Sequence, residues 1–344
     1  TLAKIPEFFG YHLFQQPMAE LFYFKNLSLF VLPLFAVFFL VKRKPGWKLS
    51  LAVLGSFLIA ALLVNLYPFL PPKNTELLTG IHLPILVWLI TGIAYMGVQW
   101  RTVGKRMDFI RFTGETVIYT GLVFCGVVVL GLFTAGIFAA IQVKVEGFVR
   151  EYLLVYGGCA AVLITGYLVE AKKSVVENFA PILAKIFSPL FFLAMVIFLL
   201  VMVIMGKSPF VDRNFLIGFD LMLALVLGLV LYVISARGIH EKCNYFDYLN
   251  LALILVALII DGIALSAIVF RLSSFGISPN KLAALGENLV LLFNLSGLAW
   301  YYLRFLLKKG DFGMLEKWQT VYLYVYAGWM VLVAFLFPVF FGFR

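Results

Sequence analysis

Charged residues are scarce in this sequence: only 13% of its 344 residues are Asp, Glu, Lys or Arg, whereas 63% are hydrophobic. A soluble domain has about 25% charged and about 45–50% apolar residues. Apolar runs of about 20 residues recur along the chain, which is the length that crosses the roughly 30 Å hydrocarbon layer of a bilayer. The runs are continuous and do not alternate with polar residues, as the strands of a β-barrel would. The sequence therefore predicts an all-α, polytopic transmembrane helical bundle.

Cysteines and catalytic motifs are also scarce. The three cysteines are scattered, so they fit neither a disulfide framework nor a CxxC metal site. There is no HExxH, GxSxG, Walker or Gly-rich dinucleotide motif. The three histidines, His12, His82 and His240, lie far apart in the chain. These absences predict a protein that is not an enzyme and that holds no metal, haem or other cofactor.

Ten apolar windows are candidate membrane spans. The first is short, and the fourth is long enough to be tilted, kinked or broken around Gly131 and Gly136. Residues 1–26, which carry four charges and two prolines, are expected to lie at the membrane interface, and residues 27–344 to form a single transmembrane domain. Because the chain begins with Thr1, we also expect a segment upstream of it. The expected spans are 27–41, 49–71, 78–100, 113–142, 152–169, 181–205, 214–236, 249–270, 282–307 and 320–341.

Lysine and arginine are distributed unevenly between alternate loops, which predicts the orientation. Seventeen of the 27 fall in one set of loops, and the others are spread over the second set and the two ends of the chain. Because cytoplasmic loops are enriched in Lys and Arg, the first set is predicted to be cytoplasmic and both ends of this chain non-cytoplasmic. The seventeen are Lys42, Arg43, Lys44, Lys48, Arg101, Lys105, Arg106, Arg111, Lys172, Lys173, Lys185, Arg237, Lys242, Arg304, Lys308, Lys309 and Lys317.

The net charge of +10 is explained by these loops. Basic loops attract anionic lipid headgroups, so we expect membrane lipids as partners and no nucleic acid. One loop, residues 101–112, has three apolar residues at helical spacing, Val103, Met107 and Ile110. Arg101 and Lys105 lie on the other side. This pattern predicts a short helix in the cytoplasmic interface, although an ordinary charged loop is nearly as consistent with it.

Four acidic residues fall within the expected spans. Glu115 sits at a cytoplasmic end beside Arg111, where a salt-bridged carboxylate costs little. Asp220, Asp261 and Glu287 lie deeper, and a carboxylate at mid-helix costs about 2.5–3.5 kcal/mol on insertion scales. We expect these three side chains to face protein or water rather than lipid.

Helical spacing places small or polar residues on the same face as each deep acid, so that another helix can pack there. His82, which opens the third span, lies at the same outer level as Asp220 and Glu287. Together they predict a polar cavity in the non-cytoplasmic half, built by the third, seventh, eighth and ninth spans. For His82 itself, a hydrogen-bonded packing residue is the favoured alternative. The shared faces are Ala257–Asp261–Ala264, Asp220–Ala224–Gly228 and Glu287–Asn294.

Two interpretations of the acids compete. They are either proton or cation sites or structural groups. As structural groups they would be neutral and hydrogen-bonded to Asn288, Asn294, Ser266 or backbone, or paired with Arg271 and Lys281. Three carboxylates in one low-dielectric space cannot all be ionised without a bound cation or a basic neighbour. On the functional interpretation, at least one is therefore protonated at neutral pH.

Three stretches of the sequence are familiar together: IHLPILVWLITGIAYMG (81–97), DFIRFTGE (108–115) and SPNKLAALGENLVLLFNLSGLAWYYLRF (278–305). They resemble a family of bacterial polytopic inner-membrane proteins catalogued only as a domain of unknown function. The resemblance extends from about residue 50 onward. It implies a bacterial cytoplasmic-membrane location and a longer parent chain with further N-terminal spans. It assigns no activity, and no role to the motif residues Glu115, Asn280 and Asn288.

We therefore expect a transporter or permease-like protein, linked to protons or cations through the polar cavity. The alternative is a non-transporting subunit or scaffold of a bacterial envelope complex, which would form a sealed bundle with a docking surface. The expected partners besides lipid are a second copy of the chain or a protein of such a complex. The sequence names no cargo.

Overall fold

The computed structural model of the chain describes residues 17–140, 145–171, 176–204, 210, 213–238, 241 and 243–344. His12, His240 and residues 1–16 of the expected interfacial segment lie outside the described residues.

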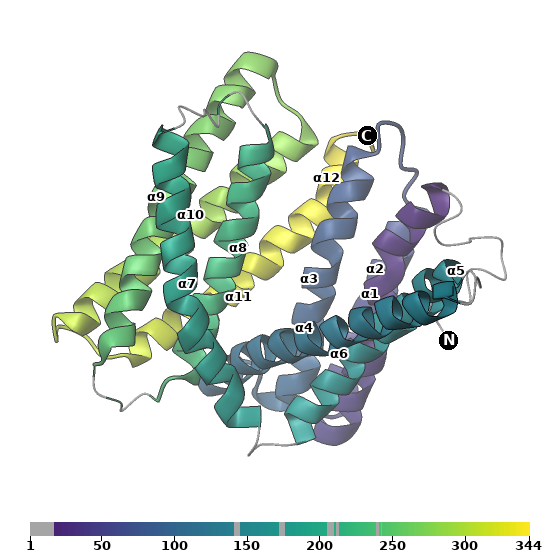
Figure 1. Ribbon diagram of the computed structural model, residues 1–344, viewed down its shortest axis with the longest axis horizontal. Helices are drawn as coiled ribbons and strands as arrows, with labels where there is room; N and C mark the ends of the chain where they lie inside the picture. The colour runs from purple at the N-terminus through teal and green to yellow at the C-terminus, as the bar shows by residue number, and fades with distance from the viewer. Residues whose placement is uncertain are drawn as a thin grey trace. The chain divides into compact units, whose positions relative to one another are not determined.

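Ten helices in the described part of the chain are long and apolar enough to cross a membrane, as the sequence predicts. Inside a bilayer every backbone N–H and C=O group needs an internal partner, and a helix supplies all of them. The protein is thus an all-α, multi-span membrane protein, and the predicted fold class is confirmed (Figure 1). The helices are α1 (Pro17–Arg43), α2 (Trp47–Leu66), α3 (Asn74–Met96), α4 (Val103–Ala140), α5 (Glu146–Phe148), α6 (Leu154–Ala171), α7 (Val176–Ile204), α8 (Arg213–Ala236), α9 (Tyr245–Phe275), α10 (Pro279–Leu306), α11 (Gly313–Val331) and α12 (Phe337–Phe340), with π-helical turns at Val149–Leu153 and Leu332–Leu336.

Two helices begin ten residues earlier than the hydropathy of the sequence predicts. Helix α1 begins at Pro17 instead of residue 27, and α4 begins at Val103 instead of residue 113. The stretch 101–112 is therefore no separate interfacial helix, which corrects that prediction. Its apolar residues Met107 and Ile110 are buried in the protein core rather than in lipid headgroups. Helix α4 then continues as one helix to Ala140.

The chain divides into two compact units, where the sequence predicts a single transmembrane domain. The first unit comprises Thr1–Trp100, Glu115–Val176 and Ala334–Arg344, and the second comprises Arg101–Gly114 and Glu177–Val333.

In the first unit, glycines let α3 and α6 approach α1 closely. A Cβ atom at Gly80 would overlap the ring of Phe24, and one at Gly166 would overlap the ring of Phe35. Small residues at such crossings are typical of helices that pack against each other in membranes.

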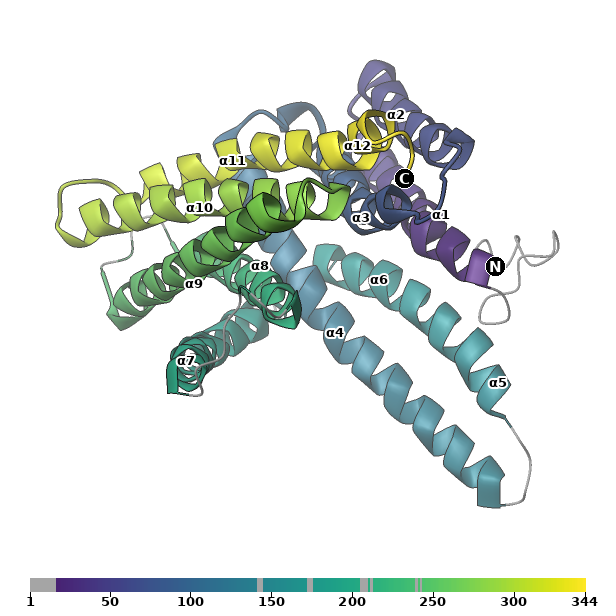
Figure 2. The ribbon, with the colours of Figure 1, turned by 90° about the horizontal axis from the view of Figure 1, so that it is seen from above.

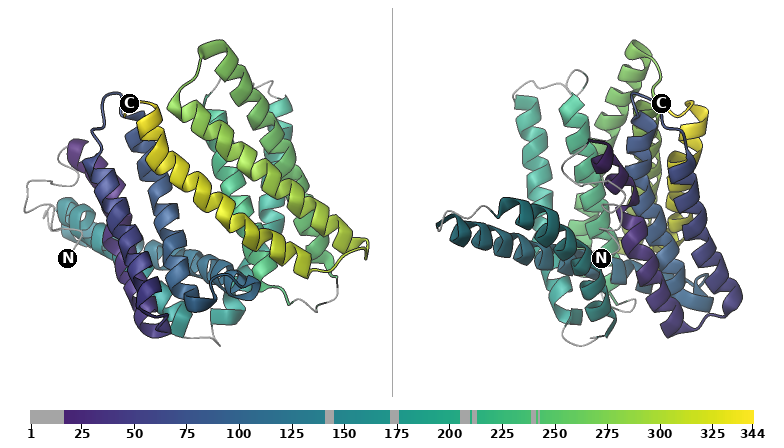
Figure 3. Two further views of the ribbon diagram at one scale, coloured as in Figure 1. Left: turned by 180° about the vertical axis from the view of Figure 1, so that it is seen from behind. Right: turned by 90° about the vertical axis from the view of Figure 1, so that its right-hand side faces the viewer.

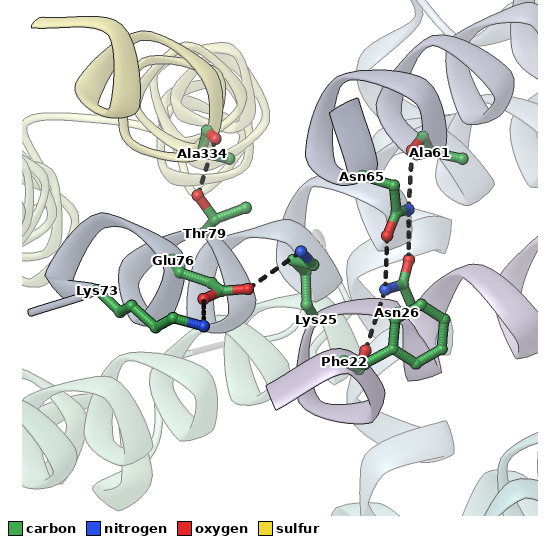
Figure 4. A network of polar contacts seen from close by, with 9 residues as sticks. All are labelled: Phe22, Lys25, Asn26, Ala61, Asn65, Lys73, Glu76, Thr79 and Ala334. Carbon is green, nitrogen blue, oxygen red and sulfur yellow. Dashed lines mark hydrogen bonds and ion pairs between the residues drawn. The ribbon is translucent and has the colours of Figure 1, made fainter. Parts of the chain in front are cut away.

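Helices α1 and α3 lie side by side and are joined near both ends by polar contacts. At one end, Lys25 Nζ lies 3.1 Å from Glu76 Oε1, and the two side chains are 9% and 8% exposed. At the other end, Arg43 Nε donates to the carbonyl of Tyr95 at 3.0 Å. Figure 4 shows the ion pair, with Lys73 Nζ 3.2 Å from the second carboxylate oxygen of Glu76.

A proline explains how the last helix is held in the first unit. Pro338 has no amide hydrogen, so the carbonyl of Ala334, four residues earlier, lacks its helical donor. Thr79 Oγ1 donates to this carbonyl at 3.1 Å, and the Tyr67 hydroxyl donates to the next carbonyl, that of Phe335, at 3.1 Å. The helix irregularity is therefore compensated by side chains from α3 and the end of α2.

In the second unit, α9 and α10 form a hairpin whose turn is closed by its own residues. Gly276 ends α9 with a φ of 72°, a left-handed conformation that glycine adopts without strain. Ser278 caps α10 by accepting from the amide of Lys281 at 3.4 Å, and Pro279 occupies the first helical position. Lys281 Nζ donates to the carbonyls of Phe275 (3.1 Å) and Gly276 (2.7 Å), which satisfies the end of α9.

Helix α10 lies between α9 and α11 (Figure 2). Indole rings of α11 pack directly against its glycines. A Cβ atom at Gly286 would overlap Trp329, and one at Gly297 would overlap Trp318. Close packing of this kind fixes the rotation of α10, and with it the direction of its polar residues.

The loop between α2 and α3 and the end of the chain lie at the same end of the first unit (Figure 3). The amide of Leu70 donates to the carbonyl of Phe343 at 2.7 Å, and that of Thr75 donates to Arg344 O at 3.0 Å. This agrees with the alternation of loops on which the predicted orientation rests.

Cysteine labelling tests the orientation. In a variant without the three native cysteines, Lys105→Cys and Lys309→Cys are expected to resist a membrane-impermeant thiol reagent in intact cells. Leu70→Cys and Ile277→Cys are expected to react. All four positions are exposed, so accessibility within the protein does not limit the reaction. The opposite labelling pattern would show that the predicted orientation is wrong.

Candidate functional site: the buried acids of the second unit

Asp261 lies near the middle of α9 on a face that is fully buried. Ala257 and Ala264, one turn away on either side, are also fully buried, so the predicted packing face is confirmed. Fourteen residues separate Asp261 from the end of α9 at Phe275, a rise of about 21 Å. Among the residues that the structure describes, neither carboxylate oxygen of Asp261 has a hydrogen-bond partner.

Asp220 of α8 is held by Asn288 of α10. Asn288 Nδ2 donates to Asp220 Oδ1 at 3.0 Å and to the carbonyl of Ala284 at 2.9 Å. Asn288 is itself fully buried, and its Oδ1 atom has no partner in the described part of the chain. One structural role proposed from the sequence, a hydrogen bond from Asn288 to an acid, is thus realised at Asp220.

The three deep acids come together in the second unit. Asp261 and Asp220 are within electrostatic range of each other, and so are Asp220 and Glu287. Asp220 and Glu287 are half-buried, whereas Asp261 is completely enclosed. We call Asp220, Asp261, Glu287 and Asn288 the acid cluster.

The structure gives no ion pair between the acid cluster and Lys281, one of the two basic residues expected near the hairpin. Lys281 is engaged with the carbonyls that end α9. Arg271 lies ten residues along α9 from Asp261, a rise of about 15 Å. Ser266 donates to the carbonyl of Ile263 at 2.7 Å, not to an acid.

The small-residue row on α8 lies on an open face of the helix. Ala224 and Gly228, which follow Asp220 at helical spacing, are exposed, and a Cβ atom at Gly228 would meet nothing within 4 Å. The expected packing of another helix against this row is therefore not seen in the described part of the chain. Asp220 is half-buried and lies within electrostatic range of the enclosed Asp261.

Asn294 joins two helices instead of lining the cluster. Its Nδ2 atom donates to the hydroxyl of Tyr326, and its Oδ1 atom accepts from Trp318 Nε1 at 2.9 Å. Both partners come from α11, so Asn294 is satisfied as a structural residue between α10 and α11.

His82 belongs to the first unit, on α3. The ring is 3% exposed, and Nδ1 lies 2.8 Å from the carbonyl of Leu78, to which it donates. The other nitrogen, Nε2, has no partner among the described residues. A cavity shared by His82 and the three acids stays a prediction.

Arg111 and Glu115, the residues expected at the cytoplasmic interface, lie one turn apart on α4, and Glu115 is buried.

Sequence reasoning missed a second buried acid on α9. Asp247 Oδ1 lies 3.0 Å from Arg237 Nε, with side chains 2% and 6% exposed. Asp247 also accepts from the amide of Asn244 at 2.8 Å, which completes a capping box at the start of α9. The spacing of Asn244 and Asp247 before an apolar run is the signal that could have found it.

Two cavities lie apart from the acid cluster. An apolar cavity of about 830 Å³ in the first unit is lined by α1, α3, α4 and α6. A smaller one of about 90 Å³ in the second unit is lined by α7, α8, α9 and the segment before α9. In the described part of the chain, no group of three or more His, Cys, Asp or Glu is arranged to hold a metal ion.

Comparison with known protein families, with curated proteins and with solved structures finds no match for this chain. The resemblance to a bacterial inner-membrane family therefore stays a prediction. What the fold establishes is an integral, multi-span membrane protein.

Proposed function

We propose that the protein is a transporter or permease-like membrane protein in which Asp261 binds a proton and couples its movement to that of a cation or small solute. The observation that supports this most directly is a fully buried carboxylate without a hydrogen-bond partner among the described residues. Ionisable residues inside the membrane commonly mark proton and ion pathways in transporters.

The chemistry of the cluster favours a proton as the bound species. Asp261 offers two acceptor oxygens and Asn288 a third, and none of them has a donor in the described part of the chain. A protonated carboxyl group carries its own O–H donor, so one proton both removes the buried charge and supplies a hydrogen-bond donor. Asp220 is close enough to repel an ionised Asp261, which adds to the advantage of protonation.

Asp220 supports a route for the proton. It is half-buried, and it lies within electrostatic range of the enclosed Asp261. In this proposal Asp220, the less enclosed of the two acids, exchanges its proton with water first and passes it on to Asp261. Asn288 positions Asp220 through the 3.0 Å hydrogen bond.

We further propose that the protein resides in a bacterial cytoplasmic membrane with both ends of this chain on the non-cytoplasmic side. Its basic loops are expected to contact anionic lipid. No catalytic step is assigned to the chain.

Asp261→Asn tests the proposal, because asparagine keeps the size of the side chain but its amide does not bind a proton near neutral pH. In infrared difference spectra, the wild-type protein is expected to show a protonated carboxylic acid at neutral pH that disappears as the pH rises. Asp261→Asn is expected to lose this band. Asp108→Asn is the matched control, because Asp108 is exposed and paired with Lys105 at 3.0 Å.

Transport is measured separately in liposomes that contain a pH-sensitive dye. Sodium, potassium and mixtures of amino acids, sugars and organic anions are added in turn. The wild-type protein is expected to move protons with one of them, and Asp261→Asn no faster than empty liposomes. A band that survives in Asp261→Asn would refute the assignment of the proton. Absence of proton movement with every probe, together with a partner that co-purifies in fixed ratio, would favour a subunit of an envelope complex.

A further inference from the structure

Arg106 is a buried arginine in the first turns of α4, on the part of this helix that belongs to the second unit. It is 7% exposed, although it is surrounded in the sequence by exposed basic residues. Its Nη1 atom donates to the carbonyl of Thr320 on α11 at 3.1 Å. Its guanidinium carbon lies 5.1 Å from the ring centre of Tyr324, one turn further along α11. These two contacts hold the guanidinium group between α4 and α11.

The charge of Arg106 has no counterpart among the described residues. Arginine stays protonated in proteins, so its charge cannot be removed by loss of a proton. The nearest acid on its own helix, Asp108, pairs with Lys105 at 3.0 Å. Glu316 is buried on the same face of α11 as Thr320, yet the structure records no ion pair between it and Arg106. A buried charge without a counterion is costly.

The contrast with Arg237 shows what a satisfied arginine looks like in this protein. The side chain of Arg237 is only 6% exposed, but Asp247 contacts it with both oxygens, at 3.0 and 3.2 Å. It also stacks against Phe305 and Phe312. Arg106 contacts one aromatic ring and one backbone carbonyl, but no carboxylate among the described residues.

Unused donors of Arg106 remain at the same place. Its Nε atom is buried without a hydrogen-bond partner in the described part of the chain. Gln319, the residue before Thr320, is 1% exposed, and neither end of its amide has a partner among the described residues. The planar fork of an arginine side chain matches the oxygens of a phosphate group, and such charge-assisted bonds are the strong ones. The other charges on these two segments are mixed: Lys105, Lys317 and Arg101 are cations, and Asp108, Asp311 and Glu316 are acids.

We propose that Arg106 anchors a phosphate-binding site between the first turns of α4 and the first half of α11, which takes the phosphate of an anionic phospholipid or free inorganic phosphate. Basic positions between membrane helices recognise lipid headgroups in this way. The site is independent of the acid cluster, so its failure and that of the proposed proton coupling are separate results.

The test uses the complete chain in nanodiscs of phosphatidylcholine, with either phosphatidylglycerol added to the bilayer or inorganic phosphate added to the buffer. Thermal unfolding is followed, and bound lipid is counted by native mass spectrometry. One of the two probes is expected to stabilise the wild-type protein. Arg106→Gln, which removes the charge but keeps a polar side chain, is expected to weaken binding about tenfold or more. Lys105→Gln, next to it and exposed, is the matched control and is expected to behave like the wild type.

The outcomes identify the source of the phosphate. A response to phosphatidylglycerol alone supports a lipid headgroup, and a response to phosphate alone supports the free ion. An equal response of the wild type and Arg106→Gln, or no response of the wild type to either probe, overturns the proposal. Should Arg106→Gln fail to fold, Arg106→Lys keeps the charge without the fork. It is then expected to bind more weakly than the wild type, and equal binding overturns the proposal too.

Discussion

Asp247→Asn is expected to lower the free energy of unfolding by about 3–5 kcal/mol, the usual cost of removing one partner from a buried ion pair. Asp247 Oδ1 lies 3.0 Å from Arg237 Nε, and Oδ2 accepts from Arg237 Nη2 at 3.2 Å. Asparagine keeps the size of the side chain but leaves the guanidinium charge uncompensated between Phe305 and Phe312. SDS titration of the purified protein in detergent micelles measures the loss.

Arg237, the other residue of this ion pair, provides the control. In the double variant Arg237→Met/Asp247→Asn, no charge is left buried, so most of the lost stability is expected to return. A double variant as unstable as Asp247→Asn alone would mean that the carboxylate acts through the capping box at the start of α9 and not through Arg237.

Asp261→Asn on the same helix gives the most informative comparison. Asp261 has neither a counterion nor a hydrogen-bond partner among the described residues, so asparagine removes no stabilising contact there. We expect a change of less than about 1 kcal/mol in the free energy of unfolding. A loss as large as that of Asp247→Asn would show that the Asp261 carboxylate makes a stabilising contact.

The contrast between the two acids of α9 supports different roles for them. A buried carboxylate that is fully engaged by an arginine has no free lone pair to offer. A buried carboxylate with two free oxygens retains the capacity to bind and release a proton. Stability and proton binding are thus assigned to separate positions on one helix, 14 residues apart.

The number and type of the helices followed from the sequence because a bilayer permits few alternatives. Continuous apolar runs must satisfy their own backbone groups, and the helix does so locally. The starts of α1 and α4 were placed ten residues late for an identifiable reason. Hydropathy counts Lys25 and Arg106 as solvated charges, whereas in the fold both are buried by contacts with distant helices. Those contacts depend on how helices pack, which a window of sequence does not contain.

The candidate site was also predictable only in part: the burial of Asp261 was predicted, but the contacts of Asn294 were not. Helical spacing placed Asp261 on a buried face, and the expected polar cavity grouped Asp220 with it. The role of Asn294 was not predictable, because its partners Trp318 and Tyr326 are supplied by the crossing of α10 and α11. The open face beside Asp220 was also not predictable, since small residues at helical spacing indicate that a helix can pack there without requiring that one does.

Glu76→Gln is expected to cost about 3–5 kcal/mol in the first unit, for the same physical reason as Asp247→Asn in the second. Glu76 Oε1 lies 3.1 Å from Lys25 Nζ, and the Lys25 side chain is only 9% exposed (Figure 4). The ammonium group also lies 4.9 Å from the ring centre of Phe69, a contact that does not replace a carboxylate. Glutamine leaves this charge buried and unpaired, so α1 and α3 are expected to separate at lower SDS concentration.

Lys73 supplies the matched control, because it contacts the same carboxylate from a more exposed position. Its Nζ atom lies 3.2 Å from Glu76 Oε2, but its side chain is 34% exposed. Lys73→Met is therefore expected to cost at most about 1 kcal/mol, as exposed ion pairs do. Lys25→Met/Glu76→Gln, which removes the buried pair completely, is expected to unfold close to the wild type. Equal losses for Lys73→Met and Glu76→Gln would show that burial of Lys25 does not set the strength of this contact, and the joint between α1 and α3 would then depend on the packing of Phe24 against Gly80.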